Sequence, residues 1–146
     1  MKKILSIFAL VLCAITLPLG LVGCKKAKQN GPEYIIGKTY TFKSVESNGF
    51  TEDEIAEIKN DFSSHRFSFT ENAILISREL NEDFSTLCYY KINKDRTLTT
   101  YKDEKMTTLS DFNNGLVFYF SKDYKKFYYK VVEEDGGKTF SVIFAC

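Results

Sequence analysis

An alternation of aromatic and polar side chains runs through most of this 146-residue chain and limits what it can fold into. It is clearest in 65–70, where Phe67 and Phe69 are separated by single polar residues. A period of two places alternate side chains on opposite faces of a β-strand, so that one face can be buried. The chain also has 13 Phe and 9 Tyr, which favour half-buried strands. These features predict an all-β fold.

Short polar turns separate the alternating segments. They favour an antiparallel up-and-down meander of about eight or nine strands that closes into a barrel or a sandwich, because either arrangement removes or protects the exposed sheet edges, and we expect the barrel. The expected strands are 37–45, 65–70, 73–76, 84–92, 97–101, 116–120, 127–132 and 139–144, with a weaker one at 106–109.

One helix interrupts this pattern after the first strand. Thr51 and Glu54 have the spacing of a capping box, in which each side chain bonds the backbone N–H of the other residue. Ile55, Ile58 and Phe62 follow at helical spacing and form one narrow apolar stripe. We therefore expect a short helix at about 52–62 that packs against the sheet.

The N-terminal segment has the order of an export signal: Lys2 and Lys3, an apolar run from Ile4 to Leu19, and then Leu21-Val22-Gly23-Cys24. The last four residues resemble the lipobox of bacterial lipoproteins. That resemblance implies a signal peptide at 1–23 and a lipid attached to Cys24. The protein would then be anchored in the cell membrane, facing outside the cytoplasm, with membrane lipid as its partner.

An uncleaved transmembrane helix is the alternative, because the apolar stretch from Ile4 to Val22 approaches spanning length. Pro18 and Gly20 disfavour it, since both interrupt a helix just before Cys24. Residues 24–33 are polar and lack apolar periodicity, which predicts a lipidated flexible tether. The folded domain is expected at 34–146.

The order of elements in this domain resembles the lipocalin-like domains of small bacterial lipoproteins: an opening strand with Gly37 ahead of Tyr40, one acidic helix, and then a run of hairpins. Lipocalins proper carry Gly-x-Trp in the first strand, whereas this chain has no Trp. The resemblance implies a small barrel that either holds a ligand or is filled by its own side chains.

Side-chain volume decides between these two interiors, and the many rings favour a filled core. If a pocket exists, its expected contacts are Tyr90, Tyr129, Arg78, Phe118 and Phe67. The residues expected to face inward by parity are Phe67, Phe69, Tyr90, Ile92, Phe118, Phe120, Phe127, Tyr129, Phe140, Val142 and Phe144.

Two cysteines remain in the folded domain. Export permits oxidation, so we predict a disulfide between Cys88 and Cys146, which would restrain the last strand. Two unpaired thiols are the alternative.

The composition argues against several classes of function. The balance of 20 Lys and Arg against 19 Asp and Glu disfavours nucleic-acid binding. His65 is the only histidine, and its parity with Phe67 indicates a partly buried strand residue, so we expect no catalytic residue, metal site or cofactor.

Two functional hypotheses remain. The first is a non-enzymatic, membrane-anchored module that binds a small apolar ligand. The second is a cell-envelope protein-interaction or structural module with a filled barrel core, which would dock another protein through Tyr89, Tyr119 and Tyr128.

Overall fold

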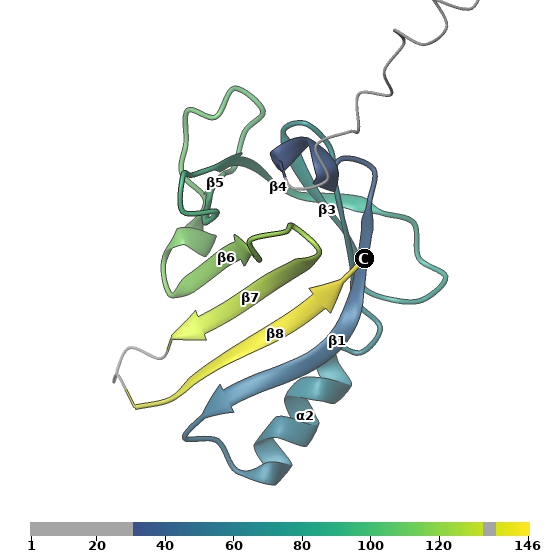
Figure 1. Ribbon diagram of the computed structural model, residues 1–146, viewed down its shortest axis with the longest axis vertical. Helices are drawn as coiled ribbons and strands as arrows, with labels where there is room; N and C mark the ends of the chain where they lie inside the picture. Colours follow the sequence, from purple (N-terminus) through teal and green to yellow (C-terminus); the bar gives the residue numbers. More distant parts are fainter. Residues whose placement is uncertain (1–30, 133–136) are drawn as a thin grey trace, which may run out of the picture.

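Eight strands follow one another along residues 31–132 and 137–146, the part of the chain that the computed structural model describes, and they form a single sheet (Figure 1). The elements are η1 (Pro32–Ile35), β1 (Thr39–Asn48), α2 (Glu52–Phe62), β2 (Arg66–Phe69), β3 (Ala73–Ser77), β4 (Ser85–Ile92), β5 (Leu98–Tyr101), η2 (Asp111–Asn113), β6 (Leu116–Phe120), β7 (Lys126–Val132) and β8 (Thr139–Ala145). The expected domain boundary at Tyr34 lies within η1, and the expected signal peptide and Cys24 lie outside the described residues.

The strand order is β5-β4-β3-β2-β1-β8-β7-β6, and every paired neighbour is antiparallel. Each strand except β5 pairs with the next strand in sequence, and β1 also pairs with β8. The predicted all-β antiparallel meander is therefore confirmed.

The edge strands β5 and β6 do not pair as strands, so the sheet is not closed into a barrel. They are linked where Thr97 and Tyr119 form an isolated bridge and the Phe120 amide donates to the Arg96 carbonyl at 3.1 Å. Along the rest of β5, the side-chain amide of Asn113 bonds both backbone groups of Thr100, at 3.1 and 2.8 Å.

The segment 102–115 thus covers the edge of β5 that a closing strand would occupy. The weak strand expected at 106–109 is absent, and only an isolated bridge joins Leu109 to Tyr101. Its backbone turns instead around Asp103, whose carboxylate accepts from the amides of Thr107 and Thr108.

The predicted helix at 52–62 is confirmed as α2. The Thr51 amide donates to Glu54 Oε2 at 2.7 Å, and the Glu54 amide donates to Thr51 Oγ1 at 3.3 Å, which completes the capping box. Glu54 Oε1 also lies 2.8 Å from Lys138 Nζ, so the start of α2 is linked to the segment before β8. Ile58 and Phe62 pack against the core.

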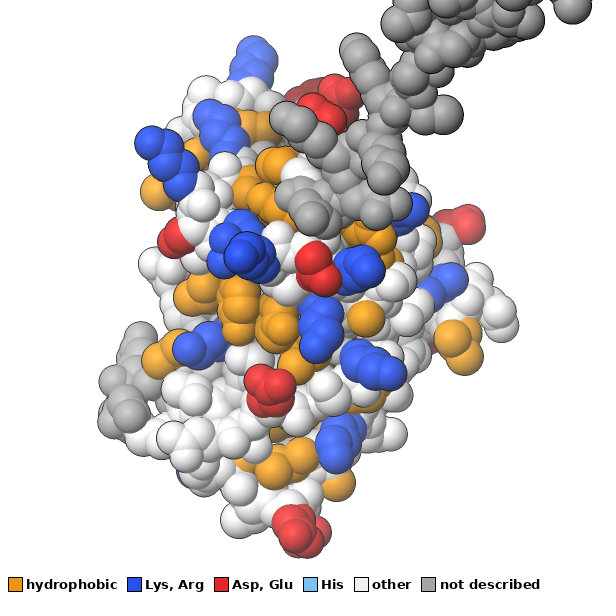
Figure 2. Space-filling view, in the orientation of Figure 1, with side chains coloured by type: hydrophobic (Ala, Val, Ile, Leu, Met, Phe, Trp, Pro, Cys, Tyr) orange, Lys and Arg blue, Asp and Glu red, His pale blue; other side chains and the backbone are white. Residues whose placement is uncertain are grey.

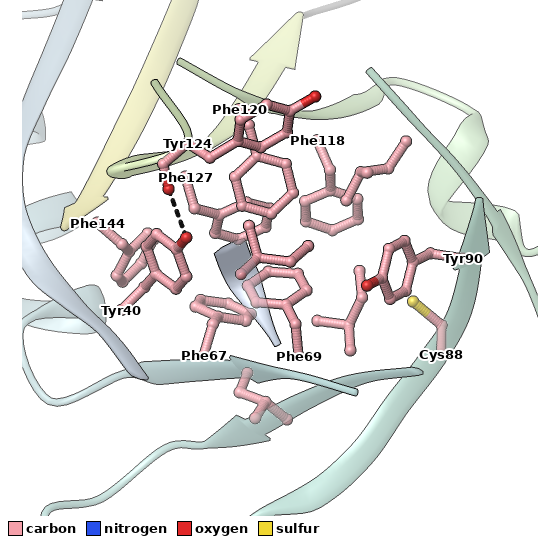
Figure 3. Close-up of a cluster of buried hydrophobic side chains, with 14 of the residues drawn as sticks. Tyr40, Phe67, Phe69, Cys88, Tyr90, Phe118, Phe120, Tyr124, Phe127 and Phe144 are labelled. Carbon is pink, nitrogen blue, oxygen red and sulfur yellow. Dashed lines mark hydrogen bonds between the residues drawn. The ribbon is translucent and has the colours of Figure 1, made fainter. Parts of the chain in front are cut away.

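The inward-facing rings predicted by parity form the core (Figure 3). Phe127 is fully buried, and its ring centroid lies 5.1 Å from those of Phe67 and Phe69 and 5.7 Å from that of Phe118. Of the eleven expected inward residues, Ile92, Tyr129 and Phe140 are partly buried and the other eight are buried.

The antiparallel order defines two ends of this interior. The end of α2, the start of β2, the end of β3 and the start of β4 lie together, and we call this the helix end. The opposite end, where β1 begins and the Ser121–Lys126 turn joins β6 to β7, we call the tyrosine end after Tyr40, Tyr90 and Tyr124.

Buried tyrosines fill the tyrosine end. Tyr124 has a positive φ of 58°, which directs the chain so that its ring contacts Phe120 at a centroid distance of 5.6 Å. The Tyr40 hydroxyl donates to the Tyr124 carbonyl at 2.5 Å, and the Tyr90 hydroxyl donates to the Thr70 carbonyl at 2.8 Å. Every one of these three side chains is at most 7% exposed.

The predicted disulfide between Cys88 and Cys146 is not present in the structure, where both are free thiols. Three strands (β3, β2 and β1) separate β4, which carries Cys88, from β8, which precedes Cys146. Cys88 is buried in the core, and that burial raises the pKa of its thiol to about 12. Cys146 is exposed, and its Sγ lies 3.9 Å from the Tyr34 hydroxyl.

Candidate ligand-binding site

A cavity of about 210 Å³ lies at the helix end, between α2 and the inner face of the sheet. It brings together four of the five predicted ligand contacts: Phe67, Arg78, Phe118 and Tyr129. The fifth, Tyr90, belongs to the filled core and to a separate surface groove of about 610 Å³ near Ile36 and Met106. The remaining residues that line the cavity are Phe62, His65, Ile76, Leu87 and Phe112.

Aromatic side chains from four elements contribute to the walls. Tyr129 on β7 is paired in register with Phe118 on β6, and their ring centroids are 5.4 Å apart. Phe62, the last residue of α2, contacts Tyr129 at 5.2 Å, and Phe112 on η2 contacts Phe118 at 6.1 Å. The aromatic walls of the cavity are thus joined by edge-to-face and tilted ring contacts.

Arg78 follows β3, and hydrogen bonds hold its backbone on both sides. The Ser64 hydroxyl donates to the Arg78 carbonyl at 2.6 Å, and the Arg78 amide donates to Glu82 Oε2 at 2.7 Å. In contrast, the Arg78 guanidinium has no hydrogen-bond or ion-pair partner among residues 31–132 and 137–146. The backbone of Arg78 is therefore held in place, while its guanidinium remains available to bind an external anion.

A second network holds the loop that carries Arg78. Ser77 is fully buried, and its hydroxyl donates to the carbonyls of Glu79 and Glu82 at 2.8 and 3.0 Å. Arg66 Nη2 donates to Ser77 Oγ at 2.8 Å and to the Glu82 carbonyl at 3.0 Å. These bonds replace the strand pairing that ends at Ser77 and keep the rim of the cavity ordered.

Two neutral polar groups face the same space. Burial raises the pKa of Tyr129, so its hydroxyl stays protonated, and that hydroxyl has no hydrogen-bond partner in the described part of the chain. Burial, and secondly the charge of Arg78, lower the pKa of His65, so its imidazole is neutral at pH 7. His65 Nδ1 is buried and also lacks a hydrogen-bond partner.

Buried polar atoms in folded proteins are normally hydrogen-bonded. His65 Nδ1 departs from this rule at the edge of one apolar cavity. The unpaired Arg78 guanidinium and the Tyr129 hydroxyl belong to the lining of the same cavity. Small-molecule sites have the same composition, with apolar walls and a few convergent polar groups. A dry cavity of roughly 150 Å³ is large enough to bind benzene, so about 210 Å³ suits a ligand with one ring or a short branched chain.

Sequence reasoning missed five of the lining residues as ligand contacts. Phe62 was expected only to pack against the sheet, and His65 only to be a partly buried strand residue. Ile76 could have been found, because it shares parity with the buried Ile74 on β3. Leu87 could not, because its parity is opposite to that of Cys88 and Tyr90 and it lies at the register shift between β3 and β4. Phe112 lies in η2, where no periodic pattern could have revealed it.

The outer face of the sheet presents the tyrosines considered for protein docking. Tyr119 and Tyr128 stack at 4.5 Å with an interplanar angle of 4°, and Tyr89, Tyr119 and Tyr128 are all partly rather than fully exposed. Figure 2 shows one face of the molecule, on which Lys and Arg side chains lie between the hydrophobic ones.

Within residues 31–132 and 137–146 there is no group of three or more His, Cys, Asp or Glu side chains suited to a metal ion. None of the described helices is long and apolar enough to cross a membrane. No family model, curated protein or solved structure matches this chain.

Proposed function

We propose that this protein is a lipoprotein, anchored in the cell membrane through a lipid on Cys24, whose domain faces outside the cytoplasm and binds a small apolar ligand. The observation that carries the binding role is the cavity at the helix end, where apolar walls meet polar groups that lack partners among the described residues. The lipid anchor rests on the sequence Leu21-Val22-Gly23-Cys24.

The sheet acts in this proposal as a lipocalin-like barrel. Its strand order differs from that of a closed up-and-down barrel only between β5 and β6, where the Thr97–Tyr119 bridge and the side chain of Asn113 supply contacts. The segment 102–115 completes the wall in place of strand pairing, and the interior is then a container with one filled end.

The proposal assigns binding rather than catalysis. A nucleophile needs a hydrogen-bonded base, and a general acid or base needs a partner that tunes its pKa. The described lining of the cavity has no serine, cysteine or carboxylate beside His65. A docking role is the second candidate, but the partly buried tyrosines of the outer face support it less than the hollow helix end supports binding.

Ligand binding can be tested with 4-fluorobenzyl alcohol and the full chain in lipid nanodiscs, followed by ¹⁹F NMR against empty nanodiscs. We expect saturable binding that is lost in Leu87→Phe, which fills the cavity. Leu75→Phe is the matched control, because Leu75 has the opposite parity on β3 to the buried Ile74 and Ile76. Equal binding by both variants, or no saturable binding to the parent protein, would contradict the proposal.

The anchor can be tested by intact mass of the protein isolated from its own membrane. We expect a chain that starts at Cys24 and carries a diacylglycerol mass, and we expect both features to disappear in Cys24→Ala. A full-length chain without lipid would instead support the transmembrane alternative.

A further inference from the structure

We propose that the ligand of this cavity is a small monocarboxylic acid, with its carboxylate at Arg78 and Tyr129 and a single ring or short branched chain among the aromatic side chains. This inference rests on the proposed binding function and specifies its ligand. It arises from the juxtaposition of one unpaired cation, one unpaired hydroxyl and an apolar interior.

The charge of the site selects an anion. Among the described residues that line the cavity, Arg78 is the only one with a charged side chain. Glu82, an acid in the loop that carries Arg78, is already bonded through Oε2 to the Arg78 amide. His65 is neutral at pH 7 because burial and Arg78 lower its pKa, so it adds no second charge. A single guanidinium matches one carboxylate, which it can bind through two parallel N–H donors.

The position of the cation indicates how the acid enters. Arg78 is exposed, whereas Phe67 and Phe118 are no more than 2% exposed. A carboxylate at Arg78 therefore stays near water, while the apolar part of the ligand is buried between the rings. Tyr129 lines the same cavity as Arg78, and its hydroxyl can donate a hydrogen bond to the carboxylate.

The volume limits the length of the ligand. About 210 Å³ is below the roughly 300–1,000 Å³ that drug-sized ligands occupy. The rings of Phe67, Phe118 and Phe127 close the cavity from the rest of the interior, since neighbouring centroids are 5.1 and 5.7 Å apart. The site thus suits benzoate-sized acids and excludes long-chain fatty acids.

The test compares 4-fluorobenzoate with 4-fluorobenzyl alcohol, which share one ring but differ in charge, by ¹⁹F NMR titration of the full chain in nanodiscs. We expect the acid to bind the parent protein about tenfold more tightly than the alcohol. Arg78→Gln should abolish this preference and leave the alcohol bound, and Tyr129→Phe should weaken acid binding about threefold. Lys94→Gln is the matched control, because it removes one exposed positive charge in the turn after β4, at the tyrosine end.

The possible failures are distinguishable. Equal affinity for the two probes, or a preference for the acid that persists in Arg78→Gln, would overturn the assignment of a carboxylate ligand while the proposed function stands. An equal loss of preference in Lys94→Gln would overturn it too, since the effect would then come from overall charge. If neither probe binds, both this inference and the proposed function fail.

Discussion

Both ends of the interior are built from tyrosines and other aromatic residues, but the tyrosine end is filled and the helix end contains a cavity. At the tyrosine end, the hydroxyls of Tyr40 and Tyr90 donate to backbone carbonyls, and rings occupy the space. At the helix end, the hydroxyl of Tyr129 has no partner in the described structure, and a cavity lies beside it. Buried tyrosine hydroxyls are normally hydrogen-bonded within the protein, as those of Tyr40 and Tyr90 are, so the Tyr129 hydroxyl beside the cavity remains available to an external molecule.

The stability of each end follows from this difference. Fully packed rings lose both transfer free energy and contacts when they are truncated, whereas a side chain beside a cavity has fewer contacts to lose. The tyrosine end should therefore carry most of the folding free energy, and the helix end should tolerate change. Four experiments test this division.

The largest contrast is expected in thiol reactivity. Because burial raises the pKa of the Cys88 thiol to about 12, its thiolate fraction at pH 8 is roughly a thousandfold below that of an ordinary cysteine. Iodoacetamide followed by peptide mapping should label the exposed Cys146 and leave Cys88 unlabelled, and denaturant should make both reactive. Rapid native labelling of Cys88 would show that the core is open, and a peptide that links Cys88 to Cys146 would restore the disulfide.

The second-largest difference is expected in the free energy of unfolding when an aromatic ring is truncated in the packed core or at the cavity wall. Phe127 is fully buried at the centre of the core, so Phe127→Ala should lower the free energy of unfolding by about 3–5 kcal/mol. Phe112 is only partly buried at the cavity wall, and Phe112→Ala should cost about 1 kcal/mol. Urea denaturation measures both values, and similar losses would remove the proposed difference between the ends.

The hydroxyls give a smaller and more specific comparison. Tyr40→Phe leaves the Tyr124 carbonyl unpaired in a buried position, which should cost about 1–2 kcal/mol. Tyr129→Phe breaks no hydrogen bond within the described structure, so its change should stay within about 0.5 kcal/mol. A large loss in Tyr129→Phe would mean that this hydroxyl is structural and would weaken the ligand assignment.

The smallest effect concerns the attachment of α2. The hydrogen bond from Lys138, followed by those from Thr51, lowers the pKa of Glu54 from 4.5 to about 2. A carboxyl whose pKa is lower in the folded state contributes stability above its unfolded pKa and loses it as the pH falls from 4.5 towards 2. Glu54→Gln should therefore lower Tm slightly at pH 7 and by less at pH 3. A difference in Tm that is independent of pH would show that the carboxylate charge is not the cause.

The sequence predicted which face of the sheet a side chain occupies better than it predicted the position of that side chain between the two ends of the interior. Parity alone identified Phe67, Phe118 and Tyr129 as inward-facing, and the structure places these three side chains around one cavity. Tyr90 has the same parity but lies at the tyrosine end. A period of two determines the face of the sheet on which a side chain lies, but not its position along the strand direction. The capping box gave the start of α2, and the apolar stripe that ends at Phe62 gave its end, since both are local signals.

Properties that depend on long-range strand order could not be predicted. Cys88 and Cys146 were paired on cellular context and spacing along the chain, but three strands separate β4 from β8 in the sheet. Similarly, the gap between β5 and β6 depends on how Asn113 bonds Thr100. Residue patterns within one strand contain no information on either relationship.

The entry of the chain into the domain determines how the cavity would be reached. The Ile36–Phe69 bridge and the bond from the Gly37 amide to the Phe69 carbonyl attach the first described residues at the tyrosine end, opposite α2 (Figure 1). The seven residues from 25 to 31 span at most about 25 Å. A lipid on Cys24 would thus attach the domain to the bilayer through its filled end and leave the cavity at the far end, where a water-soluble acid can reach it without first entering the membrane.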